Sequence, residues 1–163
     1  VVSVLIWIGM KLGRKVLIPI MATTTLVFGA ALIVGSVTAD NWATPIVDNL
    51  DWQKLDAKQI PQLVEEGKTV FVDVTAEWCI TCKANKIGVI LQDPVYSHLQ
   101  QEDIVLMKGD WTTPSESVTQ YLQSNGRFGV PFNIVYGPSY KNGIPLPVIL
   151  DSDTVIQAID AAR

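Results

Sequence analysis

The 163-residue chain contains only two cysteines, Cys79 and Cys82, and a single histidine, His98. A structural zinc site usually needs four cysteine or histidine ligands, and His98 lies sixteen residues after the nearer cysteine, so the sequence disfavours such a site. His98 is predicted to be a surface or half-buried side chain and not a ligand. We therefore expect the chemistry of this chain at the cysteine pair.

Acidic residues are missing from residues 1–38, which carry three basic side chains, Lys11, Arg14 and Lys15. The rest of the chain carries nine basic and sixteen acidic residues, and the formal net charge of the whole is −4. The acidic part has no stripe of lysine and arginine that could replace the counterions of a nucleic acid, which excludes nucleic-acid binding. The charge division predicts two parts of the chain in different surroundings.

Charged residues are also missing from residues 16–37, a run long enough to cross the ~30 Å hydrocarbon core of a bilayer as a helix. Residues 1–10 are apolar but too short to span alone, and because the chain begins with valine we expect them to end a preceding span of a longer polytopic protein. Residues 11–15 then form a basic cytoplasmic loop. The positive-inside rule predicts an inner-membrane protein whose remaining residues face the periplasm.

A secretory signal at residues 11–39 is the alternative, with cleavage after Ala39. The apolar run is longer than the roughly 7–15 residues of a signal, which favours a membrane anchor. Residues 38–50 include Pro45, show no sustained hydrophobic period and are predicted to be a linker. Residues 51–163 are predicted to be the folded domain.

Hydrophobic patterning in the folded part predicts an α/β domain with a central sheet and helices on both faces. Strands are expected at residues 51–55, 69–75, 104–108, 132–136 and 147–150, the last of them after a hairpin turn at Asn142-Gly143. Helices are expected at residues 57–66, 95–101 and 115–124, in a segment that runs from Cys79 to a break at Asp93-Pro94, and after a cap at Asp151 or Ser152. Asp56 is the expected cap of the first helix, and Gly67 is expected to end it.

The two cysteines follow the buried strand expected at residues 69–75, at the point where a strand gives way to a helix. The N–H groups of a helix N-terminus favour a thiolate, so Cys79 is predicted to be the exposed attacking nucleophile. Cys82 lies on the same helix face and is predicted to be the buried resolving cysteine. Asp73 interrupts the apolar strand, and burial would raise its pKa so that it could exchange a proton with Cys82. A paired structural acid is the alternative for Asp73.

The segment Val-Asp-Val-Thr-Ala-Glu-Trp-Cys-Ile-Thr-Cys-Lys at residues 72–83 resembles the active-site segment of thioredoxin-fold proteins. Its Asp-Val-Thr-Ala-Glu-Trp-Cys form looks like that of the C-terminal domain of the membrane thiol:disulfide interchange proteins of the DsbD and ScsB type. Phe-Gly-Val-Pro-Phe-Asn at residues 128–133 resembles the cis-proline loop of that family. The resemblance covers roughly residues 50–163 and a preceding membrane span.

This resemblance implies a thioredoxin fold and a protein-disulfide reductase that needs no cofactor. Electrons would pass from a dithiol in the membrane part of the same protein, through the redox-active Cys79–Cys82 pair, to periplasmic disulfide proteins. A cis Val130-Pro131 bond would face the disulfide, and Trp78, Val130 and Pro131 would contact the substrate. Related domains often carry a glutamate seven residues after the first cysteine, where this chain has Lys86. We expect Lys86, together with Glu77, to tune the pKa of Cys79.

Three other functions stay open on the sequence. A single-span anchored thioredoxin of the cytochrome c maturation type would lack further membrane spans before Val1. A copper-binding or copper-delivery domain could use Cys79, Cys82 and His98 as soft and borderline ligands. A redox-silent binding module is disfavoured by the two cysteines.

Overall fold

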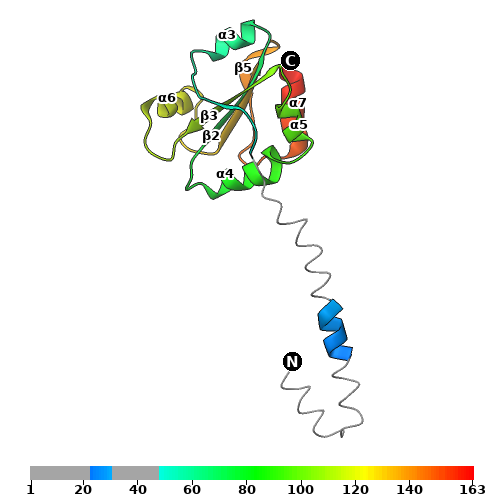
Figure 1. Cartoon of the computed structure of the whole chain (residues 1–163). Helices are drawn as coiled ribbons and strands as arrows, with labels where there is room; N and C mark the ends of the chain where they lie inside the picture. Colours follow the sequence, from blue (N-terminus) through cyan, green and yellow to red (C-terminus); the bar gives the residue numbers. More distant parts are fainter. Residues whose placement is uncertain (1–22, 31–47) are drawn as a thin grey trace, which may run out of the picture. The chain divides into compact units, whose positions relative to one another are not determined.

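The computed structural model describes residues 23–30 and 48–163 (Figure 1). Residues 23–30 are helical and belong to a different compact unit from residues 48–163. Within the described ranges no helix is both long and apolar enough to cross a membrane. The predicted preceding span at 1–10, the loop at 11–15, most of the span at 16–37 and most of the linker at 38–50 lie outside the described residues.

A mixed sheet forms the centre of the unit at residues 48–163 (Figure 1). The strands are β1 (Trp52–Lys54), β2 (Thr69–Thr75), β3 (Ile104–Asp110), β4 (Phe132–Gly137) and β5 (Tyr140–Pro145), in the order β1-β3-β2-β4-β5. The central strand β2 pairs in parallel with β3 and antiparallel with β4. Its residues from Thr69 to Val74 are all buried, as the β-branched and aromatic run predicts for a strand covered on both faces.

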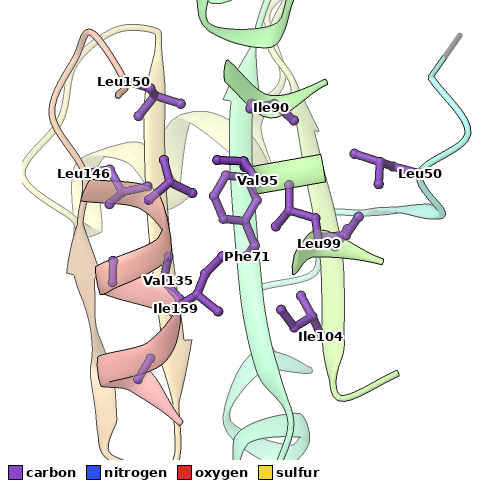
Figure 2. Close-up of a cluster of buried hydrophobic side chains, with 14 residues drawn as sticks. Leu50, Phe71, Ile90, Val95, Leu99, Ile104, Val135, Leu146, Leu150 and Ile159 are labelled. Carbon is purple, nitrogen blue, oxygen red and sulfur yellow. The ribbon is translucent and has the colours of Figure 1, made fainter. Parts of the chain in front are cut away.

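Helices cover both faces of this sheet, as predicted. They are α3 (Ile60–Glu65), α4 (Ile80–Asn85), the π-helix η1 (Lys86–Ile90), α5 (Val95–Leu99), α6 (Glu116–Ser124) and α7 (Ser152–Ala162). On one face Phe71 and Val135 pack with Leu99 of α5 and Ile159 of α7 (Figure 2). On the other face the core joins Ile60, Val72 and Leu122, which come from α3, β2 and α6. The sequence thus specifies a two-sided core around β2.

Several predicted helix boundaries are confirmed. Asp151 caps α7 by accepting a hydrogen bond from the backbone N–H of Thr154 at 2.8 Å. Gly67 follows α3 with a φ of +83°, a conformation that suits glycine and ends the helix. Asp93-Pro94 separates η1 from α5. The Val130-Pro131 bond is cis as expected, and the Asp93-Pro94 bond is also cis.

Three local predictions are wrong in detail. The first helix begins at Ile60 and not at residue 57, because the Asp56 carboxylate accepts from the backbone N–H of Lys58 and closes a turn there. The helix expected from Cys79 to Asp93 ends at Ile90, and its hydrogen-bond pattern changes from α in α4 to π in η1, which follows without a break at Lys86. Strand β3 runs on to Asp110, two residues beyond its predicted end.

The predicted hairpin at Asn142-Gly143 is also wrong. Both residues lie within β5, the turn falls at residues 138–139, and residues 147–150 form no strand. Gly143 has a φ of +79°, and a Cβ there would lie 2.7 Å from side-chain atoms of Ile134 and Tyr136. Glycine at this position therefore provides both the positive φ and the close approach to β4, and does not turn the chain.

Candidate active site

Cys79 and Cys82 lie where β2 gives way to α4, and they form a disulfide with an S–S distance of 2.02 Å. Cys79 is the N-cap residue of α4, with an extended backbone at φ −83° and ψ 104°. Its Sγ accepts a hydrogen bond from the backbone N–H of Cys82 at 3.1 Å. In the reduced protein the same N–H would stabilise a thiolate on Cys79, the sulfur predicted to be the nucleophile.

Both cysteines are buried, with exposed fractions of 6% for Cys79 and 5% for Cys82. They form a small apolar cluster with Ala76, against which Val130 packs. The prediction of a buried Cys82 is confirmed, whereas Cys79, predicted to be exposed, is also buried in the disulfide form, because the closed bond holds both sulfurs in one cluster. The contact with Val130 places the residue before the cis proline at the disulfide, as the family resemblance implied.

Large apolar side chains are exposed close to this cluster in the chain. Trp78 and Ile80 flank Cys79 and are 60% and 84% exposed, and Phe128, two residues before Val130, is 82% exposed. Pro131, the residue predicted to contact substrate beside Val130, is partly exposed. Single exposed apolar residues are ordinary, but these three lie within two residues either of Cys79 or of Val130, which packs against the cysteine cluster.

Trp78 is held by the segment that follows β3. Its indole Nε1–H donates to the backbone oxygen of Thr112 at 3.2 Å, and its ring lies 6.3 Å from that of Trp111. The backbone N–H of Glu77 donates to Thr112 Oγ1 at 2.9 Å, and the Glu77 side chain is exposed. Trp111 in turn donates from its own indole N–H to Thr119 Oγ1. No local sequence pattern connects Trp111 or Thr112 to the cysteines, so only the structure shows that they contact Trp78.

Asp73 is 6% exposed and lies near the end of β2, six residues before Cys79. It pairs in register with Lys108 of β3 and Asn133 of β4, and residues paired in this way point to the same face of a sheet. These three residues thus form a polar row across the central strands. Asn133 Nδ2 donates a hydrogen bond to Asp73 Oδ1 at 2.9 Å.

The pKa of Asp73 is raised to about 6, because burial disfavours the charged carboxylate. The hydrogen bond from Asn133 and the positive charges of Lys108 and Lys86 act in the opposite direction, and the negative charge of Asp48 adds to the rise. A carboxyl group with a pKa near 6 can both take up and release a proton near neutral pH. This is the property that the predicted role of Asp73 requires.

Lys86 is the first residue of η1, and its ammonium lies 2.6 Å from Asp48 Oδ2. Asp48 Oδ1 also accepts hydrogen bonds from the backbone N–H of Leu50 and from Trp52 Nε1, each at 3.2 Å. Burial raises the pKa of Asp48, but the ion pair with Lys86 and these hydrogen bonds outweigh that effect and lower it. The charge of Lys86, expected to act on Cys79, is thus balanced by an acid from the segment predicted to be a linker.

His98 does not join the cysteines. Its side chain is half-buried, and its Nδ1 lies 2.9 Å from the backbone oxygen of Pro94. In the part of the chain that the structure describes, no group of three or more histidine, cysteine, aspartate or glutamate side chains could hold a metal ion. The copper alternative therefore has no set of three ligands within these residues.

Comparisons with known proteins agree with this geometry. A profile of the thioredoxin-like family matches residues 51–138. Curated proteins give no significant match. The solved C-terminal domain of Neisseria meningitidis DsbD in the reduced form is 24% identical, with a TM-score of 0.51 over 65% of this chain and 92% of that domain. A thioredoxin from Thermus thermophilus is 16% identical, with a TM-score of 0.53 over 69% of this chain and 86% of that one. At these identities the likeness to solved structures shows a shared fold.

Proposed function

Since the chain belongs to the thioredoxin-like family and carries a Cys79–Cys82 disulfide, we propose that it is a protein-disulfide reductase acting by thiol–disulfide exchange. The observation that carries this proposal is the hydrogen bond from the N–H of Cys82 to Cys79 Sγ at 3.1 Å. It supports the assignment of Cys79 as the sulfur that the helix N-terminus stabilises as a thiolate. The buried carboxyl of Asp73, with a pKa of about 6, provides the proton acceptor.

The exchange proceeds in two steps. The Cys79 thiolate attacks one sulfur of the partner disulfide, and the partner's other sulfur leaves as a thiolate that takes a proton. Cys82 then gives its proton to the Asp73 carboxylate, and its thiolate attacks Cys79 Sγ. This closes the Cys79–Cys82 disulfide and releases the second partner thiolate, which is protonated in turn. Two electrons pass from the cysteine pair to the partner.

The partner is a protein disulfide presented on an extended segment. Val130 packs against the cysteine cluster, and Pro131 has no N–H that could bond to the site itself. The segment would lie along these residues while apolar side chains of the partner contact Trp78, Ile80 and Phe128, which are exposed. With such contacts, the domain would recognise a partner by how accessible its disulfide is more than by a particular amino-acid sequence around it.

The domain is proposed to face the periplasm, tethered to the inner membrane by residues 16–37. Support comes from the three basic residues directly before that apolar run and from the acidic character of the remainder. The electron donor would be a dithiol in the membrane part of the same protein, as the resemblance of residues 72–83 to the DsbD and ScsB type implies. A single-span anchored thioredoxin of the cytochrome c maturation type is the alternative, and the gene sequence upstream of Val1 distinguishes the two.

Trapping of mixed disulfides tests the proposal. A Cys82→Ala variant exposed to periplasmic extract should accumulate partners bound to Cys79, because the resolving thiol is missing. A Cys79→Ala, Cys82→Ala double variant is the control and should capture none. Absence of adducts, together with no electron transfer from the reduced protein to insulin disulfides, would overturn the proposal. Metal analysis of the reduced protein addresses the copper alternative.

A further inference from the structure

Asn133 is a polar side chain in the middle of an otherwise apolar strand. It lies between Phe132 and Ile134 in β4 and is 2% exposed. Burying an amide in such a strand lowers stability unless its polar atoms find partners. The amide of Asn133 donates to Asp73 Oδ1 at 2.9 Å, and this is the one hydrogen bond that the Asp73 carboxyl accepts from the described residues.

We propose that Asn133 is a positioning residue for proton exchange at Asp73: its amide holds Oδ1 and leaves Oδ2 for the proton that Cys82 gives up. This inference rests on the proposed thiol–disulfide exchange. A primary amide suits the role because its NH₂ group donates to the carboxylate, whereas its carbonyl oxygen can accept from the protonated acid if the amide rotates. Asn133 can therefore partner Asp73 in both protonation states.

The other groups that act on Asp73 do so without a hydrogen bond to it. They are the ammonium groups of Lys108 on β3 and Lys86 on η1, and the carboxylate of Asp48 before β1. Lys86 and Asp48 form an ion pair at 2.6 Å, so their opposite effects at Asp73 partly cancel. Asn133 is thus the neighbour that orients the carboxyl by direct contact.

Replacement of Asn133 by leucine removes the donor and keeps the size of the side chain. A hydrogen bond to a charged group is strong enough that its loss should move the titration midpoint of Asp73 upward by about one pH unit or more. The ¹³C shift of the Asp73 carboxyl, followed against pH in the oxidised protein, measures this directly. The measurement needs no partner and no turnover.

The same substitution should alter the rate at which Cys82 resolves a mixed disulfide on Cys79. With the midpoint one unit higher, the rate at pH 6 should fall roughly fivefold, while the rate above pH 8 stays close to that of the wild type. Thr69→Val is the matched control. Thr69 is also buried, lies on the same face of β2 as Asp73, and its Oγ1 has no hydrogen-bond partner, so its loss should leave both readouts unchanged.

If Asn133→Leu does not fold, Asn133→Asp keeps the shape and places a second carboxyl beside Asp73. The pair should then titrate in two steps, the upper one above the wild-type midpoint. An Asp73 midpoint that neither variant moves overturns the inference, and so does a midpoint that moves without the resolution rate following it. Failure of the wild type to exchange disulfides at all would instead remove the proposed function, and the carboxyl titration would still decide whether Asn133 governs the proton on Asp73.

Discussion

Asp73 shows how one side chain links catalysis to stability. Its carboxyl is 6% exposed, and burial raises its pKa to about 6. The same burial that makes it a proton acceptor near neutral pH makes its charged form unfavourable in the folded protein. The ionised form of Asp73, which proton exchange with Cys82 requires, therefore lowers the stability of the folded protein.

Asp73→Asn should stabilise the protein at pH 8 but not at pH 4. The folded protein keeps the Asp73 proton up to about pH 6, whereas the unfolded chain loses it near pH 3.9. The contribution of Asp73 to the free energy of unfolding is therefore complete below its pKa in the unfolded chain. It is lost as pH rises through its pKa in the folded protein, by an amount on the order of 3 kcal/mol. Urea unfolding at both pH values measures it. Asp51→Asn, at an exposed position, is the control, and an equal gain for Asp73→Asn at both pH values would contradict the prediction.

Asp73→Asn should also slow the resolution of mixed disulfides at pH 7 by about tenfold or more, because an amide cannot accept the proton of Cys82. Stopped-flow fluorescence of Trp78 and Trp111, which lie beside the site, can follow the reaction. The far-UV spectrum should remain that of the wild type. A rate that is unchanged from pH 6 to pH 9 would remove Asp73 from the mechanism.

Cys79 should react before Cys82 when the reduced protein is treated with limiting iodoacetamide. The reason is the N–H of Cys82, which points to Cys79 Sγ at 3.1 Å and favours its thiolate. Peptide mass spectrometry identifies the modified residue. Modification of Cys82 first would show that the nucleophile and the resolving cysteine have been assigned in the wrong order.

Among the secondary-structure elements, α4 depends most clearly on contacts outside itself. With η1, which continues it directly, it spans residues 80–90, still too short for an isolated helix to be stable in water. Asn85 at the end of α4 is 4% exposed and joins it to the segment after β5: its Nδ2 donates to the oxygen of Val148 at 2.8 Å, and its Oδ1 accepts from the N–H of Leu150 at 3.1 Å. Tertiary hydrogen bonds thus hold the helix that carries the cysteines.

Asn85→Leu should destabilise the protein by about 2–3 kcal/mol, because two backbone groups near the core lose their partner. The midpoint and slope of urea unfolding measure the change. Gln92→Ala is the matched control, since Gln92 makes a comparable bond to the oxygen of Ile87 at 2.9 Å on the exposed surface. That control should cost less than about 0.5 kcal/mol, and an equal loss in both variants would contradict the role given to Asn85.

For the whole molecule, the compartment decides whether the cysteine pair can act as a reductant. If the proposed location is right, the pair lies where disulfides persist, so it must be reduced from elsewhere. Residues 39–163 expressed alone in the periplasm should then accumulate with Cys79 and Cys82 oxidised, whereas the intact protein should be partly reduced. Trapping with a mass-tagged maleimide reads out both states. A mostly reduced isolated domain would indicate a cytoplasmic location or another donor.

Local pattern was sufficient for the main features of the fold and the site. The apolar run at residues 69–75 predicted β2 with its observed bounds, and the change of pattern after Trp78 placed the cysteines at a strand–helix junction. A carboxyl interrupting that run predicted the buried Asp73. The cis Val130-Pro131 bond came from the family resemblance and not from a pattern within this chain. These predictions depend on periodicity and helix-terminus chemistry, which neighbouring residues determine.

Tertiary structure alone decided which side chains meet. Asn133 reaches Asp73 across 60 positions of sequence, Thr112 holds Trp78 across 34, and Lys86 pairs with Asp48. The interruption of the apolar strand by Asn133 was a visible signal, but it had no partner until β2 and β4 paired in register. The hairpin predicted at Asn142-Gly143 was wrong because tertiary packing decides here too. The dipeptide is favourable for a turn, but Gly143 instead allows close packing against Ile134 and Tyr136 within the sheet. Contacts of this kind depend on strand order and register, which are set by the packing of the whole sheet and not by any single segment.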